Sequence, residues 1–477
     1  MAPLKISFTL LLLLFSYVLP AQEVNKLVGS WEGKLNVGIE LRVVFHIKED
    51  AKSGFITTAD SPDQSAYGLK CDNTTIKENE VIIEMNTMNA SFTGKLLNDS
   101  TIEGMFKQGA ELPLTLRKVT TTAENKENKR PQTPKPPFSY QSEDVLYYSR
   151  DKSLTYGATI TIPKGNGPFP SIVLITGSGQ QDRDENILGH KIFAVIADHL
   201  TKAGYIVLRA DDRGMGKSTG IFNEATSEDF AIDVSNSVDY LLTRPEADKN
   251  KIGLIGHSEG GMIAPMVAAK RNDIHFVILL AAPGVRIVEL MAEQNAAIAK
   301  ANGASKETTE SIKPLFIRVA NAIYDAPDSA QAFANAAMIT ENWVRTKSID
   351  VLKELEFETV AKREAYITEM VKEFRSPWFR YFLKFDPGPY LEQLKCKVLA
   401  LNGEKDIQVI SSQNLAGIKR ALKNSSSKQF EIKELPNLNH LFQTCEKCTI
   451  EEYGQLTETF SPVALQIISD WLNKNIK

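Results

Sequence analysis

The chain has 477 residues, of which 43% are hydrophobic and 24% charged, values typical of a globular protein long enough for two or three domains. Its 55 basic and 59 acidic residues give a net charge of -4, which offers no basic surface for nucleic acid. The composition therefore indicates neither overall disorder nor nucleic-acid binding, and it fits a small, nearly neutral substrate.

The first 21 residues are typical of a secretory signal peptide. One lysine precedes an apolar run at 6–19, and Pro20 and Ala21 precede the polar Gln22. We expect cleavage near Ala21 and a periplasmic or secreted protein. An uncleaved anchor is the alternative, although the run is short for a membrane span. No later stretch is long and apolar enough to cross a bilayer, so we expect no membrane span after cleavage.

Residues 22–118 alternate apolar or β-branched residues with polar ones, for example at 39–45 and 81–85. Turn residues such as Gly54 and Asn73 recur between these runs. The pattern predicts an all-β domain of about eight short strands, either a small barrel or a sandwich. Ligand binding by this domain stays open, because a Gly-Ser-Trp opening is only weakly suggestive of a lipocalin.

Residues 119–137 are charged and proline-rich, which predicts a solvated, partly extended linker. Over residues 138–477 strand and helix patterns alternate, with apolar strand runs at 205–209 and 276–280 and a helix pattern at 230–242. This alternation predicts an α/β fold with a doubly wound, mainly parallel sheet.

Two glycine-rich turns follow predicted strands in this part. Gly177 and Gly179 come directly after the strand at 171–176 and let backbone amides turn toward a ligand. The second turn, at 211–218, contains Gly-x-Gly-Lys-Ser but lacks the spacing of a phosphate-binding loop. We expect its aspartate and arginine side chains to order neighbouring loops rather than to react.

The segment at 256–260 reads Gly-His-Ser-Glu-Gly between an apolar strand at 251–255 and a helix pattern from Met262. Glycines on both sides of Ser258 allow a sharp turn, which exposes the serine hydroxyl at the end of the strand. A serine held in this way is a candidate nucleophile. The alternative is an ordinary helix N-cap serine.

A serine nucleophile needs an imidazole to accept its proton and a carboxylate to orient that imidazole. After a turn of this kind, the acid and then the histidine follow along the chain. Only His275 and His440 of the six histidines follow Ser258, and His275 comes too early to leave room for an acid-bearing strand. His440, in a loop after a strand pattern, is therefore the predicted base.

The predicted acid is Asp406, in the loop after the apolar strand that begins at Lys397. Glu404 is the alternative, but we expect it to face solvent. The negative oxygen formed in the reaction needs backbone donors.

We assign the oxyanion donors to the amide of Glu259, which follows the nucleophile, and to the amide of Ser178. Gly179 is the alternative to Ser178. The second assignment rests on the glycine-rich turn after the strand at 171–176. A turn that only reverses the chain is the alternative explanation.

Four separate motifs resemble exported bacterial carboxylesterases of the EstD type, in the α/β-hydrolase superfamily. They lie at 176–185, 211–220, 256–261 and 438–443. The resemblance extends over about residues 138–477, and more loosely over the N-terminal domain. It implies an α/β-hydrolase that hydrolyses carboxylic esters through Ser258, Asp406 and His440. We expect short to medium acyl chains, and neither a cofactor nor a metal.

A helical stretch at about 285–392 separates the serine from its predicted acid, where a cap would overhang the active site. Aromatic residues at 376–382 face either an acyl group or the core of the cap. Cys445 and Cys448 depart from the EstD-type pattern, and we expect them to form a structural disulfide rather than a metal or redox site.

Two other functions stay open alongside the esterase. A serine peptidase or aminopeptidase of the same fold would use the same triad, although residues 22–118 are too few for an oligopeptidase propeller. A non-catalytic protein that binds a ligand or glycan through its β domain is the second. The expected partner is a small-molecule ester, and nothing in the sequence indicates an oligomeric state.

Overall fold

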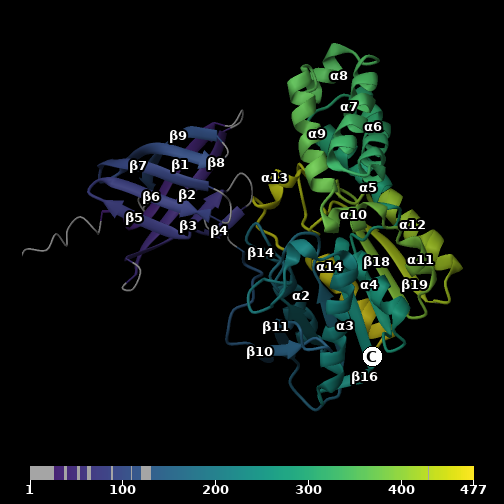
Figure 1. Cartoon of the computed structure of the whole chain (residues 1–477). Helices are drawn as coiled ribbons and strands as arrows, with labels where there is room; N and C mark the ends of the chain where they lie inside the picture. The colour runs from purple at the N-terminus through teal and green to yellow at the C-terminus, as the bar shows by residue number, and fades with distance from the viewer. Residues whose placement is uncertain are drawn as a thin grey trace, which may run out of the picture. The chain divides into compact units, whose positions relative to one another are not determined.

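The computed structural model describes residues 26–36, 40–50, 54–61, 66–86, 90–108, 110–119, 130–427 and 429–477. The predicted signal peptide and most of the predicted linker lie outside these residues. The chain divides into two compact units, Met1–Lys126 and Glu127–Lys477 (Figure 1).

The described part of the first unit is one antiparallel sheet of nine strands in the order β4-β3-β2-β1-β9-β8-β7-β6-β5. The strands are β1 (Gly29–Asn36), β2 (Glu40–Asp50), β3 (Gly54–Ser61), β4 (Ala66–Lys70), β5 (Asn73–Lys77), β6 (Glu80–Met85), β7 (Ala90–Asn98), β8 (Thr101–Gln108) and β9 (Ala110–Val119). Most neighbouring strands are consecutive in the chain, as expected for a meander.

The sheet of the first unit curls around a single core. Trp31, Phe45 and Phe92 are completely buried there, on strands whose alternate residues face outward. Near the two edges of the sheet, the Thr74 hydroxyl on β5 donates to the Thr57 hydroxyl on β3 at 2.8 Å. Of the two predicted architectures, the structure is nearer to a barrel, with nine described strands where about eight were expected.

The main sheet of the second unit has the order β10-β11-β15-β12-β16-β17-β18-β19. The strands are β10 (Gln141–Tyr148), β11 (Thr155–Ile162), β12 (Phe169–Ile175), β15 (Ile206–Ala210), β16 (Ala247–His257), β17 (Phe276–Leu280), β18 (Lys397–Gly403) and β19 (Phe430–Leu435). From β15 onward all pairs are parallel, while β10 and β11 are antiparallel. A short hairpin, β13 (Asn186–Ile187) and β14 (His190–Lys191), lies apart from this sheet.

Helices cover both faces of this sheet, because successive residues of its strands point to opposite sides. Ile172 and Leu174 of β12 pack with α2 (Ile192–Lys202) and α14 (Pro462–Asn475). Val173 and Ile175 pack with the helices of the other face (Figure 1), which are α3 (Ser227–Thr243), α4 (Glu259–Lys270) and α12 (Ser411–Asn424). The predicted doubly wound, mainly parallel α/β sheet is confirmed.

Between β17 and β18 the chain forms helices with a separate apolar core. They are α5 (Ile287–Ala301), α6 (Lys306–Asp325), α7 (Ser329–Val344), α8 (Ile349–Glu354), α9 (Val360–Phe374) and α10 (Pro377–Lys384). The short α11 (Gly388–Glu392) instead packs with the helices of the sheet through Leu391. The remaining short helices are η3 (Phe222–Glu224) and α13 (Ile450–Tyr453).

The last residues of the predicted linker are anchored to the second unit. The Arg130 guanidinium donates to the carbonyls of Leu188, Gly454 and Leu456 at 2.7–3.0 Å. The Gln132 side chain also exchanges hydrogen bonds with this unit, donating to the Phe460 carbonyl at 2.6 Å. The expectation of a solvated linker is therefore wrong for Arg130 and Gln132, because carbonyls that are partly withdrawn from water need donors and these side chains supply them, whereas residues 135–137 are exposed.

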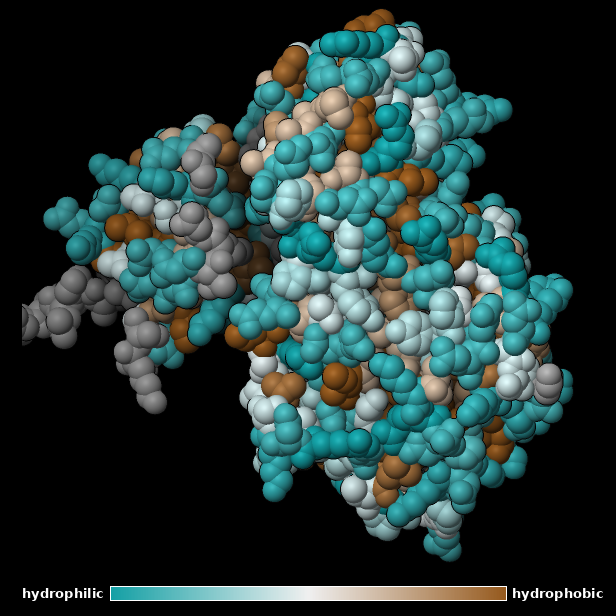
Figure 2. Space-filling model, turned by 45° about the vertical axis from the view of Figure 1, so that its right-hand side comes forward, coloured by the Kyte–Doolittle hydropathy of each residue, from teal (hydrophilic) through white to brown (hydrophobic). Residues whose placement is uncertain are grey.

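Hydrophilic side chains cover most of the face drawn in Figure 2, and hydrophobic ones occur in small groups, as is usual for globular proteins. In the described part of the chain, no helix combines the length and the hydropathy that a membrane span requires.

Candidate active site

Ser258 lies in a strained turn between β16 and α4. Its backbone has φ 52° and ψ -118°, outside the conformations that a non-glycine residue ordinarily adopts. The two flanking glycines are required by close packing, because a Cβ on Gly256 would collide with the Gly260 carbonyl and one on Gly260 with the Ile175 carbonyl. The turn therefore presents the serine at the carboxyl end of the central strand, as the sequence predicts for a nucleophile.

Asp406 and His440 form a buried pair, 3% and 4% exposed. The Nδ1 atom of His440 lies 2.8 Å from Oδ2 of Asp406. The other carboxylate oxygen accepts from the amides of Gln408 and Val409 at 2.8 and 2.9 Å, which fixes the plane of the carboxylate. This arrangement holds Nδ1 as a donor and leaves Nε2 of the ring to accept a proton.

Glu404, the alternative acid, is exposed, and among the described residues it has no hydrogen bond to His440. Its carboxylate accepts from the Asn437 amide at 3.2 Å, and this hydrogen bond, with Lys405, lowers the pKa of Glu404. The structure thus brings Asp406 and not Glu404 to the histidine.

The histidine loop lies against the serine turn. The rings of His440 and His257, the residue before Ser258, have centroids 4.9 Å apart. The Nε2 atom of His257 also donates to the His440 carbonyl at 3.0 Å. The three predicted triad residues therefore come from three loops at the carboxyl ends of β16, β18 and β19, where ligands bind in open α/β sheets.

The predicted oxyanion loop follows β12 and touches the serine turn. A Cβ on Gly177 would lie 3.2 Å from Cβ of Ser258. Among the hydrogen bonds of the described residues, none uses the amide of Ser178 or of Gly179. The amide of Glu259 is the first of α4, where no carbonyl of the helix can accept from it. All three predicted donors are thus available to a ligand oxygen.

Comparisons with known proteins point to one fold. The family model described as serine aminopeptidase, S33, matches residues 190–352. Esterase EstD of Thermotoga maritima is 37% identical over 135 residues, which are 28% of this chain and 32% of the relative. The chain therefore matches about a third of the length of this curated relative, and the predicted resemblance to EstD is confirmed over that stretch.

Residues Glu127–Lys477 form the hydrolase domain, named for its α/β-hydrolase fold, and residues 190–352 within it match the family model. Among solved structures, esterase Pf2001 of Pyrococcus furiosus is 14% identical, with a TM-score of 0.43, over 71% of this chain and 92% of its own. Est1E of Butyrivibrio proteoclasticus, solved with ferulic acid, is 17% identical, with a TM-score of 0.40, over 69% and 99% of the two chains.

The side chain of Glu259 makes buried contacts in the hydrolase domain that sequence reasoning missed. It is 2% exposed and accepts from the Ser227 hydroxyl at 2.6 Å and from Nε1 of Trp378 at 3.0 Å. Burial raises the pKa of Glu259, against hydrogen bonds that include one from Ser178. The carboxyl group thus joins the serine turn to α3 and to α10 of the cap. Its only signal in the sequence is its place beside the predicted nucleophile.

The loop after β15 orders the oxyanion loop. The Asp212 carboxylate accepts from the Thr176 hydroxyl at 2.9 Å and from the Gln181 amide at 2.7 Å. Arg213 instead turns to Asp233, with Nε 2.6 Å from Oδ2. Both residues hold loops in place, and among the described residues neither has a hydrogen bond to the predicted triad.

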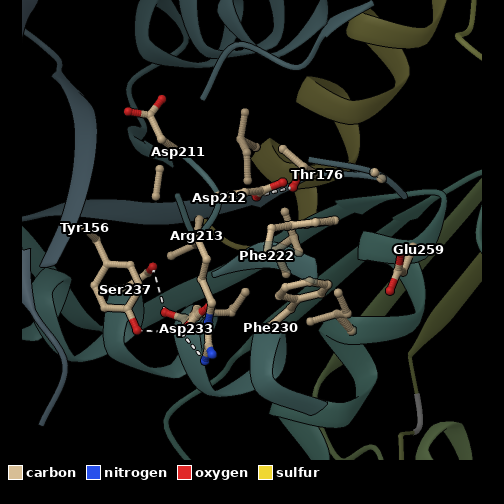
Figure 3. A pocket seen from close by; sticks show the side chains of 18 residues that line it. Tyr156, Thr176, Asp211, Asp212, Arg213, Phe222, Phe230, Asp233, Ser237 and Glu259 are labelled. Atoms are coloured by element: carbon tan, nitrogen blue, oxygen red, sulfur yellow. Dashed lines mark hydrogen bonds and ion pairs between the residues drawn. The ribbon is translucent and has the colours of Figure 1, made fainter. Parts of the chain in front are cut away.

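A cavity of about 50 Å³ begins at the oxyanion loop of the hydrolase domain. Gly177, Gly179 and Glu259 line one end of it. Figure 3 shows Phe222 and Phe230 side by side between Arg213 and Glu259, with ring centroids 5.1 Å apart. The cavity therefore has an apolar wall close to the serine turn, and Ser258 itself is not among its lining residues.

Cys445 and Cys448 form a disulfide in the loop that follows His440. The Glu452 carboxylate accepts from the Cys448 amide at 2.6 Å and from the two amides before it. Because both sulfur atoms are bonded to each other, they are not available as thiolate ligands for a metal.

Proposed function

We propose that the protein is a serine carboxylesterase. The observation that carries the proposal is the buried Asp406–His440 pair beside the strained Ser258 turn. His440 takes the proton of the Ser258 hydroxyl through Nε2 as the serine oxygen attacks the ester carbonyl, and then gives that proton to the leaving alcohol. Water releases the acid from the acyl-enzyme by the same steps in reverse order.

Three backbone amides support the same reaction. The tetrahedral intermediate places a negative charge on the former carbonyl oxygen, and donors fixed before the reaction stabilise that charge. The amides of Glu259 and Ser178, or Gly179 in place of Ser178, serve as these donors. Asp406 keeps Nδ1 of His440 protonated, so that the ring accepts only through Nε2.

We propose short to medium acyl chains as substrates. The cavity beside the oxyanion loop is small, and the rings of Phe222 and Phe230 form its apolar wall. An acyl group of a few carbons fits such a space, whereas a long chain requires the cap to move.

The test is the substitution Ser258→Ala with p-nitrophenyl acetate and butyrate as substrates. We expect hydrolysis to fall by at least about 10³-fold, with an unchanged circular-dichroism spectrum. Ser348→Ala, at the exposed N-terminus of α8, is the matched control and retains full activity. A fluorophosphonate probe labels the parent protein and not the Ser258 variant. Turnover retained by that variant would exclude the proposed nucleophile.

An aminopeptidase is the second candidate, because the matching family model carries that description. Such an enzyme needs a free carboxylate to bind the amino group of its substrate. Glu259 and Asp212, whose carboxyl groups line the cavity beside the oxyanion loop, already accept hydrogen bonds from protein donors. Aminoacyl anilides assayed beside the simple esters distinguish the two activities, and faster cleavage of the anilides would favour the peptidase.

We also propose that the protein is exported. The support is the predicted signal peptide at 1–21 together with the disulfide between Cys445 and Cys448, since disulfides persist in oxidising compartments.

A further inference from the structure

A second acid–histidine pair lies behind the serine turn, apart from the predicted triad. His257 is 2% exposed and Glu185, in the loop before β13, is completely buried. The Nδ1 atom of His257 lies 3.0 Å from Oε1 of Glu185. The second carboxylate oxygen of Glu185 has no hydrogen-bond partner among the described residues.

Hydrogen-bond partners indicate that His257 is a charged imidazolium. Its Nε2 faces the His440 carbonyl at 3.0 Å, and a carbonyl oxygen can only accept, so Nε2 carries a proton. Its Nδ1 faces a carboxylate, which accepts a hydrogen bond from it, so Nδ1 also carries a proton. Burial alone would lower the pKa of His257, but the Glu185 charge and these hydrogen bonds, with a smaller contribution from Asp406, raise it overall.

The pair connects the two loops on which the proposed reaction depends. Oε1 of Glu185 also accepts from the Gly177 amide at 2.7 Å, and so holds the first residue of the oxyanion loop. His257 holds the backbone of His440, the proposed base. Gly177 and His440 thus reach Ser258 from different elements, and one buried ion pair fixes both.

We propose that His257 and Glu185 are a charged positioning pair, which fixes the oxyanion loop and the histidine loop relative to Ser258. The inference rests on the proposed esterase function. Displacing a catalytic group by about 1 Å costs about 10²-fold in rate, so a contact with each loop is sufficient to matter.

The charge of the pair determines both contacts. If His257 loses a proton while Nε2 still donates to the His440 carbonyl, the bare Nδ1 faces an oxygen of Glu185 and repels it. The charged or titratable groups that act on His257 are Glu185, Asp406 and the neighbouring ring of His440; Phe442 packs edge-on to it and carries no charge. Glu185 is the one of these that the triad does not use.

Glu185→Gln tests the pair, because it removes the charge and keeps the shape. The amide cannot serve both Gly177 and a neutral His257, so we expect kcat for p-nitrophenyl acetate to fall about 10²-fold at pH 8 with little change in KM. At lower pH His257 regains its proton and both contacts return. The ratio of the variant kcat/KM to that of the parent therefore falls as the pH rises from 5.5 to 8.5.

Two further variants separate positioning by charge from a loss of packing. The double variant E185Q/H257Q has no titrating group in the pair, so its ratio to the parent stays constant with pH. Asp60→Asn removes the charge from a similar pair in the first unit, where His46 Nε2 lies 2.8 Å from Asp60 Oδ2. This matched control leaves kcat and the pH profile unchanged.

Nitrogen-15 NMR of the parent protein tests the charge state without any substrate. We expect one histidine with both ring nitrogens protonated at pH 7, and loss of that signal in E185Q. A neutral His257 in the parent, an unchanged kcat in E185Q, or a pH-independent ratio for E185Q would each overturn the proposal. If the parent hydrolyses no ester, the esterase function fails, whereas the NMR result still decides the state of the pair.

Discussion

Asp406 is the residue on which the proposed base depends. The amides of Gln408 and Val409 fix one of its oxygens, and the other lies 2.8 Å from Nδ1 of His440. The contact therefore sets the tautomer and the direction of the ring at once, and no other carboxylate among the described residues makes it.

Asp406→Asn should reduce kcat for p-nitrophenyl esters by about 10⁴-fold, because an amide nitrogen at this place favours the wrong tautomer of His440. Glu404→Gln should leave kcat within about twofold, since Glu404 is exposed and bonded to the Asn437 amide. Steady-state kinetics of both variants at pH 8 provide the measurement. A larger loss from the Glu404 variant would assign the acid to that residue.

Asp212 makes the stability of the hydrolase domain depend on pH. Burial raises the pKa of Asp212 to about 7, against hydrogen bonds from Gln181 and Thr176, and the charges of Glu185 and Glu259 raise it further. An unfolded aspartate titrates at about 3.9, so between about pH 4 and pH 7 the folded state binds more protons. The free energy of unfolding therefore falls as the pH rises through this window.

Asp212→Asn should weaken that dependence, because the amide keeps an acceptor for the Gln181 amide and carries no charge. Thermal unfolding followed at pH 5, 6, 7 and 8 gives the comparison, and the Tm of the variant should change less than that of the parent. Equal slopes for both proteins would show that Asp212 does not cause the pH dependence.

Sequence reasoning could predict residues whose signal lies in a local turn or in the order of strands and loops. The Ser258 turn follows from glycines within two residues of it, and Asp406 and His440 follow from the order of strands and loops. The partners of Glu259 were missed, since Ser227 and Trp378 are 32 and 119 residues away in the chain. Such contacts form only when several elements pack together, so no local sequence pattern predicts them.

The hydrogen bond from Trp378 joins a cap helix to the residue that follows the proposed nucleophile. The indole of Trp378 stacks on Phe382 within α10, with ring centroids 4.8 Å apart, while its Nε1 reaches the Glu259 carboxyl group. The contact ties α10 to the first residue of α4.

Trp378→Phe removes this donor and keeps an aromatic ring. We expect the free energy of unfolding to fall by about 1–2 kcal/mol and KM for p-nitrophenyl butyrate to rise, because the cap loses a contact at the site. Trp343→Phe is the matched control, since Trp343 packs against Phe357 within the cap core and should change stability without changing KM. Chemical denaturation and steady-state kinetics are the measurements. A KM unchanged by Trp378→Phe would remove α10 from the substrate site.

At the level of elements, the alternation of apolar and polar residues predicted the strands of the first unit. It did not predict whether their sheet curls into a barrel or forms a sandwich. The period-2 pattern of the first unit is the same in a barrel and in a sandwich. What distinguishes them is the approach of β3 to β5 through Thr57 and Thr74, which are 17 residues apart and belong to non-consecutive strands. The mainly parallel sheet of the second unit was easier to predict, because buried parallel strands are continuous apolar runs.

For the whole molecule, the proposed export is the property with the most consequences for the rest of the chain. Cleavage near Ala21 would remove the apolar run at 6–19 and leave a chain that begins close to Gln22. The oxidising compartment would then favour the disulfide between Cys445 and Cys448.

Expression in a bacterium with an outer membrane tests this. We expect the protein in the periplasmic or extracellular fraction, with a mature N-terminus at or near Gln22 by sequencing and without free thiols at Cys445 and Cys448 by mass spectrometry. Deletion of residues 1–21 should retain the protein in the cytoplasm. An intact N-terminus on protein from the membrane fraction would instead indicate an uncleaved anchor.

The anchoring of Arg130 and Gln132 changes where the catalytic fragment begins. Gln132 accepts from the amides of Thr459 and Phe460, and the Phe460 ring stacks on Phe442, two residues after the proposed base. A chain started at residue 138, where the α/β pattern begins, would lack this support. One started at residue 127 would keep it, so we expect the smallest independently active fragment to include a segment that composition alone assigns to the linker.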